Sequence, residues 1–127
     1  MSAGRNPLRA ALYVGGLVAT SAGLHTVLAG VKSLPGKQRA NSSVDSELRF
    51  YAAFYVAYGL AVLRTAPRAD RDVAAVRGLA GALFLAGLAR GGAWLATGKP
   101  HPAQRALLAI ELAAPPILVA SQARVAR

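Results

Sequence analysis

Four long runs of apolar residues alternate with short polar segments along the chain. The runs extend over about residues 8–31, 46–64, 76–97 and 104–122. At 1.5 Å of rise per residue, about 20 residues of helix cross the hydrocarbon core of a bilayer. The pattern therefore predicts four transmembrane helices.

The polar segments between these runs are short and contain turn and helix-capping residues. Residues 32–45 include the capping sequence Asn-Ser-Ser at 41–43, and residues 98–102 read Gly-Lys-Pro-His-Pro. Because short connectors make successive helices antiparallel, we expect an all-α fold, an integral membrane four-helix up-down bundle with both termini on the same side. Nothing marks a second domain, so we expect residues 1–127 to form one transmembrane domain.

Composition supports a membrane protein. The 127 residues are 54% hydrophobic and 16% charged, which is too apolar for an ordinary soluble domain. The net charge of +10 would by itself suggest a nucleic-acid partner. However, the basic residues lie mostly between the apolar runs, so we expect them to face anionic lipids and expect no nucleic-acid partner.

The basic residues also predict an orientation. In an up-down arrangement, the side of the termini carries Arg5, Arg9, Arg64, Arg68, Arg71, Arg77, Arg124 and Arg127, and the opposite side carries Lys32, Lys37, Arg39, Lys99 and Arg105. Because basic residues in short loops concentrate in the cytoplasm, we expect both termini there.

Metal and redox chemistry find little support in the sequence. The chain has no cysteine and only two histidines, His25 and His101, far apart in the sequence. Disulfides and thiolate chemistry are therefore excluded, and we expect no metal site. No glycine-rich phosphate loop or other cofactor motif occurs, so no cofactor is expected.

Two charges lie deep inside apolar runs, Arg90 in the third and Glu111 in the fourth. A charge in hydrocarbon costs about 3 kcal/mol or more, so it normally faces the bundle interior, water or an opposite charge. Counted from the connector between the two runs, these residues differ in depth by only about 3–5 Å. An ion pair between them is therefore possible.

The second run carries an acid and most of the aromatic residues. Glu47, Tyr51, Tyr55 and Tyr58 share one helix face, because their spacings of four, four and three follow the helical repeat. Glu47 enters the membrane from the same side as Arg90 and Glu111, so we expect a polar pocket there. His25 of the first run is a further candidate for it.

Arg49 lies about 200° around the helix from Glu47. It is therefore not expected in the pocket. It can pair with Asp45 one turn earlier, or extend to the membrane interface.

Prolines near Glu111 add polarity to the fourth run. Pro115 has no N–H, so the carbonyl of Glu111 loses its usual helical partner, and Pro116 does the same to Leu112. We expect a kink just beyond the acid, because freed carbonyls in a membrane need another donor.

Small residues recur at a spacing of four on two of the runs. The first run has Gly15, Ala19 and Gly23, and the third has Gly87 and Gly91. Such ridges let helix backbones approach closely. We expect them to serve internal packing first, with homo-oligomerisation as the alternative.

The most specific segment is Glu-Leu-Arg-Phe-Tyr at 47–51, within Asn-Ser-Ser-Val-Asp-Ser-Glu-Leu-Arg-Phe-Tyr-Ala-Ala-Phe at 41–54. Together with Tyr58-Gly59, Arg90-Gly91-Gly92 and Glu111, it resembles a family of small bacterial four-helix membrane proteins catalogued as a domain of unknown function, number 4345. The resemblance covers nearly the whole chain. It implies a multi-pass protein of the bacterial plasma membrane with a shared acid, arginine and tyrosine pattern, and implies no reaction.

Three functions remain open, and a membrane binding or accessory module is favoured, its pocket holding a lipid-like molecule or a partner helix. A proton- or cation-coupled transporter acting as an oligomer is the first alternative, but no inverted repeat is visible. A membrane enzyme of the acid-catalysed isomerase or cyclase type is the second alternative. It is disfavoured because no nucleophile and base pair occurs, and catalytic residues are unknown.

Each candidate also has a purely structural interpretation. Arg90 and Glu111 can fix helix register, and Glu47 can simply lie at the interface near a helix start. The tyrosines can form an interfacial aromatic belt, for which Tyr51 has a suitable depth and Tyr58 lies too deep. His25 can bond to a carbonyl. His101 is expected to be an ordinary loop residue.

Overall fold

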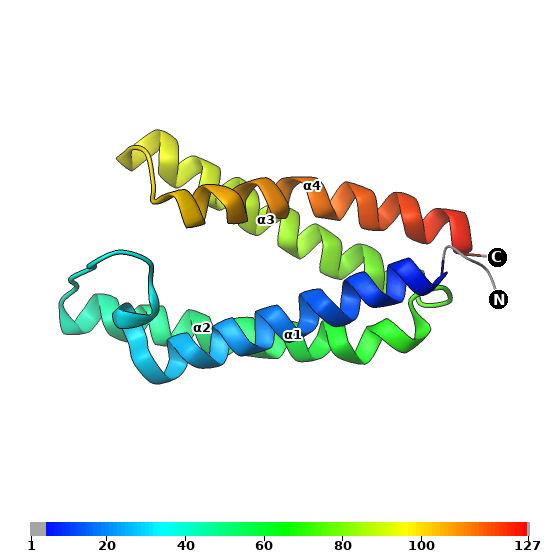
Figure 1. The fold of residues 1–127 in the computed structure, drawn as a ribbon, viewed down its shortest axis with the longest axis horizontal. Coiled ribbons are helices and arrows are strands. Elements are labelled where there is room, and N and C mark those ends of the chain that lie inside the picture. The colour runs from blue at the N-terminus through cyan, green and yellow to red at the C-terminus, as the bar shows by residue number, and fades with distance from the viewer. Residues whose placement is uncertain (1–4, 127) are drawn as a thin grey trace. The chain divides into compact units, whose positions relative to one another are not determined.

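The computed structural model describes residues 5–126, and the side chains of residues 7–126. Of the basic residues used to predict orientation, Arg127 and the side chain of Arg5 lie outside this part of the chain. The described residues form the helices α1 (Arg5–Ala29), α2 (Ser42–Thr65), α3 (Val73–Thr97) and α4 (Pro102–Val125), with short 3-10 helices η1 (Gly30–Ser33) and η2 (Ala66–Arg68) (Figure 1). They contain no strand. The predicted all-α fold with four long helices is confirmed.

Side-chain caps set the starts of three helices. The Asn41 side chain accepts a hydrogen bond from the Val44 amide at 2.9 Å, so α2 begins four residues before the predicted position 46. Asp72 accepts from Ala75 at 3.1 Å at the start of α3. His101 accepts through Nδ1 from Ala103 at 3.1 Å, ahead of α4. His101 is therefore a helix cap, a role that its interpretation as a plain loop residue missed.

Two helices are followed by glycines with a positive φ. Gly30 follows α1 with a φ of 60°, and Gly98 follows α3 with a φ of 99°. Other residues rarely adopt this conformation because their Cβ would clash with the backbone. These glycines end the helices and allow the chain to turn.

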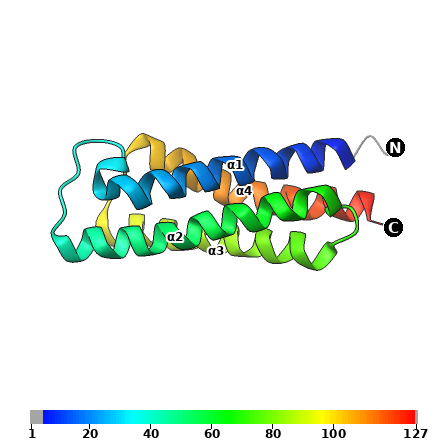
Figure 2. The same cartoon turned by 90° about the horizontal axis from the view of Figure 1, so that it is seen from below.

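The chain divides into two compact units. One is Ala10–Pro67, which holds most of α1 and all of α2, and the other combines α3 and α4 with the start of α1 up to Arg9. Within each unit the two long helices run antiparallel, side by side in both views (Figures 1 and 2). Each connector is short enough to give this hairpin arrangement.

Glycines allow α1 and α2 to pack closely. A Cβ added to Gly23 would lie 2.9 Å from the Val56 amide nitrogen, and one added to Gly59 would lie 2.5 Å from the Thr20 amide nitrogen. By contrast, an added Cβ at Gly15 would meet nothing within 4 Å. Gly23 therefore serves packing inside its own unit, whereas oligomerisation through the glycine ridges stays a prediction.

Three segments are long and apolar enough to cross a membrane: Pro7–Ser33, Val73–Thr97 and Pro102–Val125. Large apolar side chains on them are exposed, including Leu28 at 71% and Leu95 at 92%. Such surface is unfavourable in water and indicates an integral membrane protein. α2 is less apolar, because Arg49 and Arg64 bound its central stretch and three tyrosines lie within it, so its place as a fourth span stays a prediction.

Candidate functional site

α4 packs closely against α3 where a glycine of α3 faces the acid of α4. A Cβ added to Gly87 would lie 2.9 Å from Leu112 Cδ2 and 3.0 Å from Glu111 Cβ. At Gly91, one turn later, the nearest atom is Leu108 Cδ1 at 3.8 Å. The absence of a side chain at Gly87 therefore lets the backbone of α4 approach α3 at Glu111.

Arg90 and Glu111 form the ion pair that their depths allow. Arg90 Nε donates to Glu111 Oε2 at 2.9 Å and to Oε1 at 3.2 Å, and Arg90 Nη2 donates to Oε1 at 3.0 Å. The Glu111 side chain is 8% exposed, whereas that of Arg90 is 34% exposed. The carboxylate is thus buried against a planar guanidinium that matches both of its oxygens, and the other edge of that guanidinium remains accessible.

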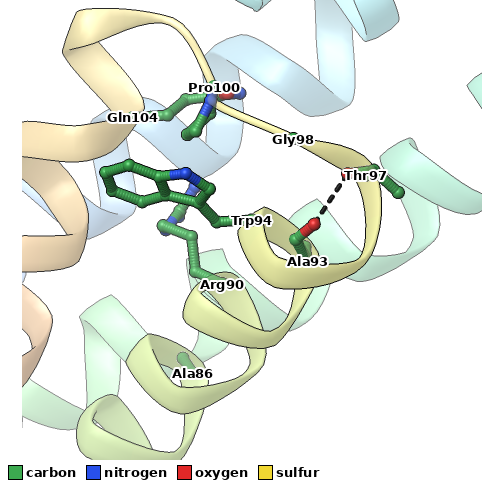
Figure 3. Close-up of a pocket in the computed structure, with 8 residues that line it drawn as sticks. All are labelled: Ala86, Arg90, Ala93, Trp94, Thr97, Gly98, Pro100 and Gln104. Carbon is green, nitrogen blue, oxygen red and sulfur yellow. Dashed lines mark hydrogen bonds between the residues drawn. The ribbon is translucent and has the colours of Figure 1, made fainter.

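A cavity of about 400 Å³ lies beside this pair, at the connector between α3 and α4. Its walls are Ala86, Arg90, Ala93, Trp94, Thr97, Gly98, Pro100 and Gln104 (Figure 3). The Arg90 side chain extends toward the Trp94 ring, and Pro100 and Gln104 lie across from that ring. This volume lies within the usual range of small-ligand pockets.

The polar groups around the cavity are mainly donors without partners. Among the described residues, Arg90 Nη1, the Trp94 indole N–H and the Gln104 side-chain amide have no hydrogen-bond partner. The Thr97 hydroxyl donates to its own helix at the Ala93 carbonyl, at 2.7 Å. Glu111 balances the charge of Arg90, so the cavity wall is close to neutral while still offering N–H groups.

α4 continues through its two prolines, and the predicted kink beyond Glu111 stays a prediction. α4 runs from Pro102 to Val125 through Pro115 and Pro116, and Pro115 is buried. Glu111 therefore sits in a continuous helix four residues before a position without an N–H.

The remaining candidate residues lie in the other unit. On α2, Glu47 is exposed, Tyr51 is 63% exposed, and Tyr55 stacks on Tyr58 with ring centroids 6.2 Å apart. His25 on α1 is exposed. The structure thus joins Arg90 with Glu111, and a pocket shared by these residues with Glu47, the tyrosines and His25 stays a prediction.

A second polar cluster ties the end of α1 to the start of α2. Asp45 Oδ1 accepts from the Val31 amide at 2.8 Å, and Asp45 Oδ2 accepts from Arg49 Nε at 2.8 Å. Arg49 Nη1 also donates to the carbonyls of Val27 and Leu28, each at 3.0 Å. The interaction between Arg49 and Asp45 was one of two predicted alternatives, and here it also satisfies carbonyls at the end of α1.

The Val31 amide and the Arg49 guanidinium both favour the charged form of Asp45. The Val31 hydrogen bond, followed by that of Arg49, lowers the pKa of Asp45 below its usual 3.8. This cluster therefore holds its charge at neutral pH, and it explains the arginine in the Glu-Leu-Arg-Phe-Tyr segment in structural terms.

The family described as domain of unknown function (DUF4345) matches residues 7–122. The chain belongs to this family. Comparison with curated proteins and with solved structures gives no match. The DUF4345 match covers α2 and α3 fully and all but the outermost residues of α1 and α4. It includes Arg90 and Glu111 and assigns no activity to them.

Several features of the DUF4345 chain were missed from the sequence. Trp94 and Gln104 line the cavity, and Arg9 pairs with the buried Asp70 at 2.7 Å. Trp94 could have been predicted from the sequence, because it follows Arg90 by four residues and therefore lies on the same helix face. Gln104 could not have been predicted, because its position depends on how the connector turns.

Proposed function

We propose that this protein is a membrane binding or accessory module whose α3–α4 cavity holds the polar head of an amphipathic molecule. The protein would lie in the bacterial plasma membrane with both termini in the cytoplasm, as the basic residues predict. The observation that carries the proposal is the Arg90–Glu111 pair, with its acid buried and its arginine partly exposed, beside a cavity with N–H groups that have no partner among the described residues.

The hydrogen-bond donors in the cavity wall indicate which headgroups can bind. Arg90, Trp94 and Gln104 offer N–H groups, so a headgroup rich in acceptor oxygens fits better than one rich in donors. Because Glu111 compensates Arg90, the bound head needs no full negative charge, and phosphate and hydroxyl oxygens are both suitable.

The position of the cavity suits a molecule with an apolar tail. The cavity borders the Gly98–Pro100 connector, where α3 ends, and therefore lies near the membrane interface if the helices span the bilayer. The exposed side chains of Leu88 and Ile110 belong to the same two helices and offer apolar surface toward the membrane core. A tail could therefore extend into lipid while the head occupies the cavity.

Tryptophan fluorescence tests the proposal, because Trp94 is the single tryptophan of the chain. The purified protein in amphipol is titrated with dihexanoyl phosphatidylglycerol, and the emission of Trp94 is recorded. We expect a saturable change. In Arg90→Gln and Gln104→Leu, binding should weaken by at least about fivefold, equivalent to the loss of one hydrogen bond of about 1 kcal/mol.

Leu95→Ala is the matched control. Leu95 neighbours Trp94 in sequence, is 92% exposed and does not line the cavity. Its titration should equal that of the unmodified protein. Gln104→Leu covers the case in which Arg90→Gln unfolds, because the Gln104 side chain makes no hydrogen bond with the described residues. A change that does not saturate, or that is equal in all variants, would contradict the proposal.

A further inference from the structure

Glu47 is the one acid without a basic partner among residues 5–126, which the structure describes. The other acids each pair with an arginine: Asp45 with Arg49, Asp70 with Arg9, Asp72 with Arg68 and Glu111 with Arg90. All five acids of the sequence lie in the described part of the chain. In a protein with a net charge of +10, an acid that remains unpaired points to a cation outside the chain.

The surface next to Glu47 is aromatic and exposed. Phe50 is 57% exposed, and Tyr51 and Phe54 are each 63% exposed. The Phe50 ring meets the Tyr51 and Phe54 rings edge-on, with centroids 5.5 and 5.2 Å apart. These edge-to-face contacts hold the rings in fixed orientations and leave ring faces uncovered.

The helical repeat brings the acid and the rings together. Phe50, Tyr51 and Phe54 follow Glu47 by three, four and seven residues on α2, so all four lie on one side of the helix. Long side chains on a helix lean toward its N-terminus. The rings of Phe50 and Tyr51 therefore lean over the turn that carries Glu47. A carboxylate beside aromatic faces is the combination that binds ammonium groups.

The location on α2 favours a lipid as the source of the ammonium. Glu47 lies five residues after Ser42, the first residue of α2, which is about 8 Å along the helix. If α2 spans the bilayer, this depth is that of the headgroups, where aromatic residues concentrate. The preceding connector adds the exposed cations Lys37 and Arg39. A zwitterionic headgroup, with an ammonium and a phosphate, complements both signs of charge.

We propose that Glu47, Phe50, Tyr51 and Phe54 form a site for the ammonium group of a phospholipid. The Glu47 carboxylate neutralises the cation, and the ring faces of Phe50 and Tyr51 attract it through their negative quadrupoles. This site is on α2 and is separate from the cavity between α3 and α4, so the two proposals stand or fall independently.

Native mass spectrometry tests the site. The full chain is released from detergent with an equimolar mixture of phosphatidylethanolamine, phosphatidylcholine, phosphatidylglycerol and phosphatidic acid that share the same acyl chains. We expect the two ammonium lipids to be retained about three- to tenfold more than the other two, as a cation–π and ion-pair site would give. Glu47→Gln should abolish this preference, and Phe54→Leu should reduce it.

Phe84→Leu is the control, because Phe84 is an exposed ring on α3 in the other unit. It should leave the preference unchanged. The Glu47 side chain makes no hydrogen bond or ion pair with the described residues, so Glu47→Gln should also keep its melting temperature. Equal retention of all four lipids overturns the proposal. It is also overturned if Glu47→Gln leaves lipid retention unchanged and instead shifts the protein between oligomeric states, since the cation would then come from a protein.

Discussion

Arg90 on α3 and Glu111 on α4 are joined by three hydrogen bonds of 2.9, 3.0 and 3.2 Å, although 21 residues separate them in the sequence. The acid is buried and the arginine is partly exposed. The pair thus links the two helices and at the same time forms one wall of the cavity.

A double-mutant cycle should show that these two residues act together. Arg90→Gln or Glu111→Gln leaves a charged partner without its counterpart, so each should lower the free energy of unfolding by about 1–3 kcal/mol. The double variant should lose little more than either single variant, because it leaves no unpaired charge. Chemical denaturation in detergent measures the free energy of unfolding of the two single variants and the double variant.

The exposed pair Arg68–Asp72 provides the comparison for this cycle. These side chains are 50% and 32% exposed. Their removal should change the free energy of unfolding by less than about 1 kcal/mol. Additive losses at Arg90 and Glu111 would mean that the two residues contribute separately.

Substitution at Gly87 should disturb the same contact without changing a charge. An added methyl group would lie 2.9 Å from Leu112 Cδ2 and 3.0 Å from Glu111 Cβ, which is too close. Gly87→Ala should therefore lower stability by about 1–2 kcal/mol. Gly81→Ala on the same helix should leave stability unchanged, because a Cβ added to Gly81 would meet nothing within 4 Å. Melting temperatures distinguish the two, and an equal effect at both positions would refute the close approach at Gly87.

The connection between α1 and α2 should be sensitive at Gly30. This glycine has a φ of 60°, and an added Cβ would collide with Asp45 Oδ1. Gly30→Ala should lower the melting temperature, because it strains the backbone and displaces the Asp45–Arg49 cluster. Gly15→Ala, in an open helical position, should leave the melting temperature unchanged or raise it slightly. An unchanged melting temperature in Gly30→Ala would contradict a stabilising role of the Asp45–Arg49 cluster.

Asp45 should make stability depend on pH in the acidic range. Its pKa is lower in the folded protein than the usual 3.8, so it contributes stability above about 3.8 and loses this contribution as the pH falls toward the folded pKa. The difference in melting temperature between the unmodified protein and Asp45→Asn should therefore shrink as the pH falls from about 6 to about 3.

Arg49→Gln refines this test. It removes one partner of Asp45 and keeps the hydrogen bond from the Val31 amide. Part of the pH dependence should therefore remain in this variant. If Asp45→Asn differs from the unmodified protein equally at every pH, the Val31 and Arg49 contacts do not stabilise the charged acid.

The long-range features that could be predicted are those set by helix geometry. The apolar runs predicted the four helices. Because the rise per residue in a helix is constant, counting residues from the connector predicted that Arg90 and Glu111 lie at similar depths. The same periodicity placed Glu47 and Tyr51 on one face of α2.

Features that depend on backbone ends and on side-chain directions could not be predicted. Arg49 donates to the carbonyls of Val27 and Leu28. The sequence does not show which carbonyls remain without a backbone partner at the end of a helix, so this contact could not be predicted. The contribution of Gln104 to the cavity depends on the turn at Gly98, whose φ of 99° is not encoded by apolar spacing.

The ion pairs also differ in when they can form during synthesis. Asp45–Arg49 and Arg68–Asp72 are four residues apart and can close within one turn of a nascent helix. Arg90 can pair only after Glu111, 21 residues later in the chain, has been synthesised. A lone arginine is costly in lipid, so we expect the translocation machinery to release α3 into the bilayer only together with α4, as a preformed helical hairpin.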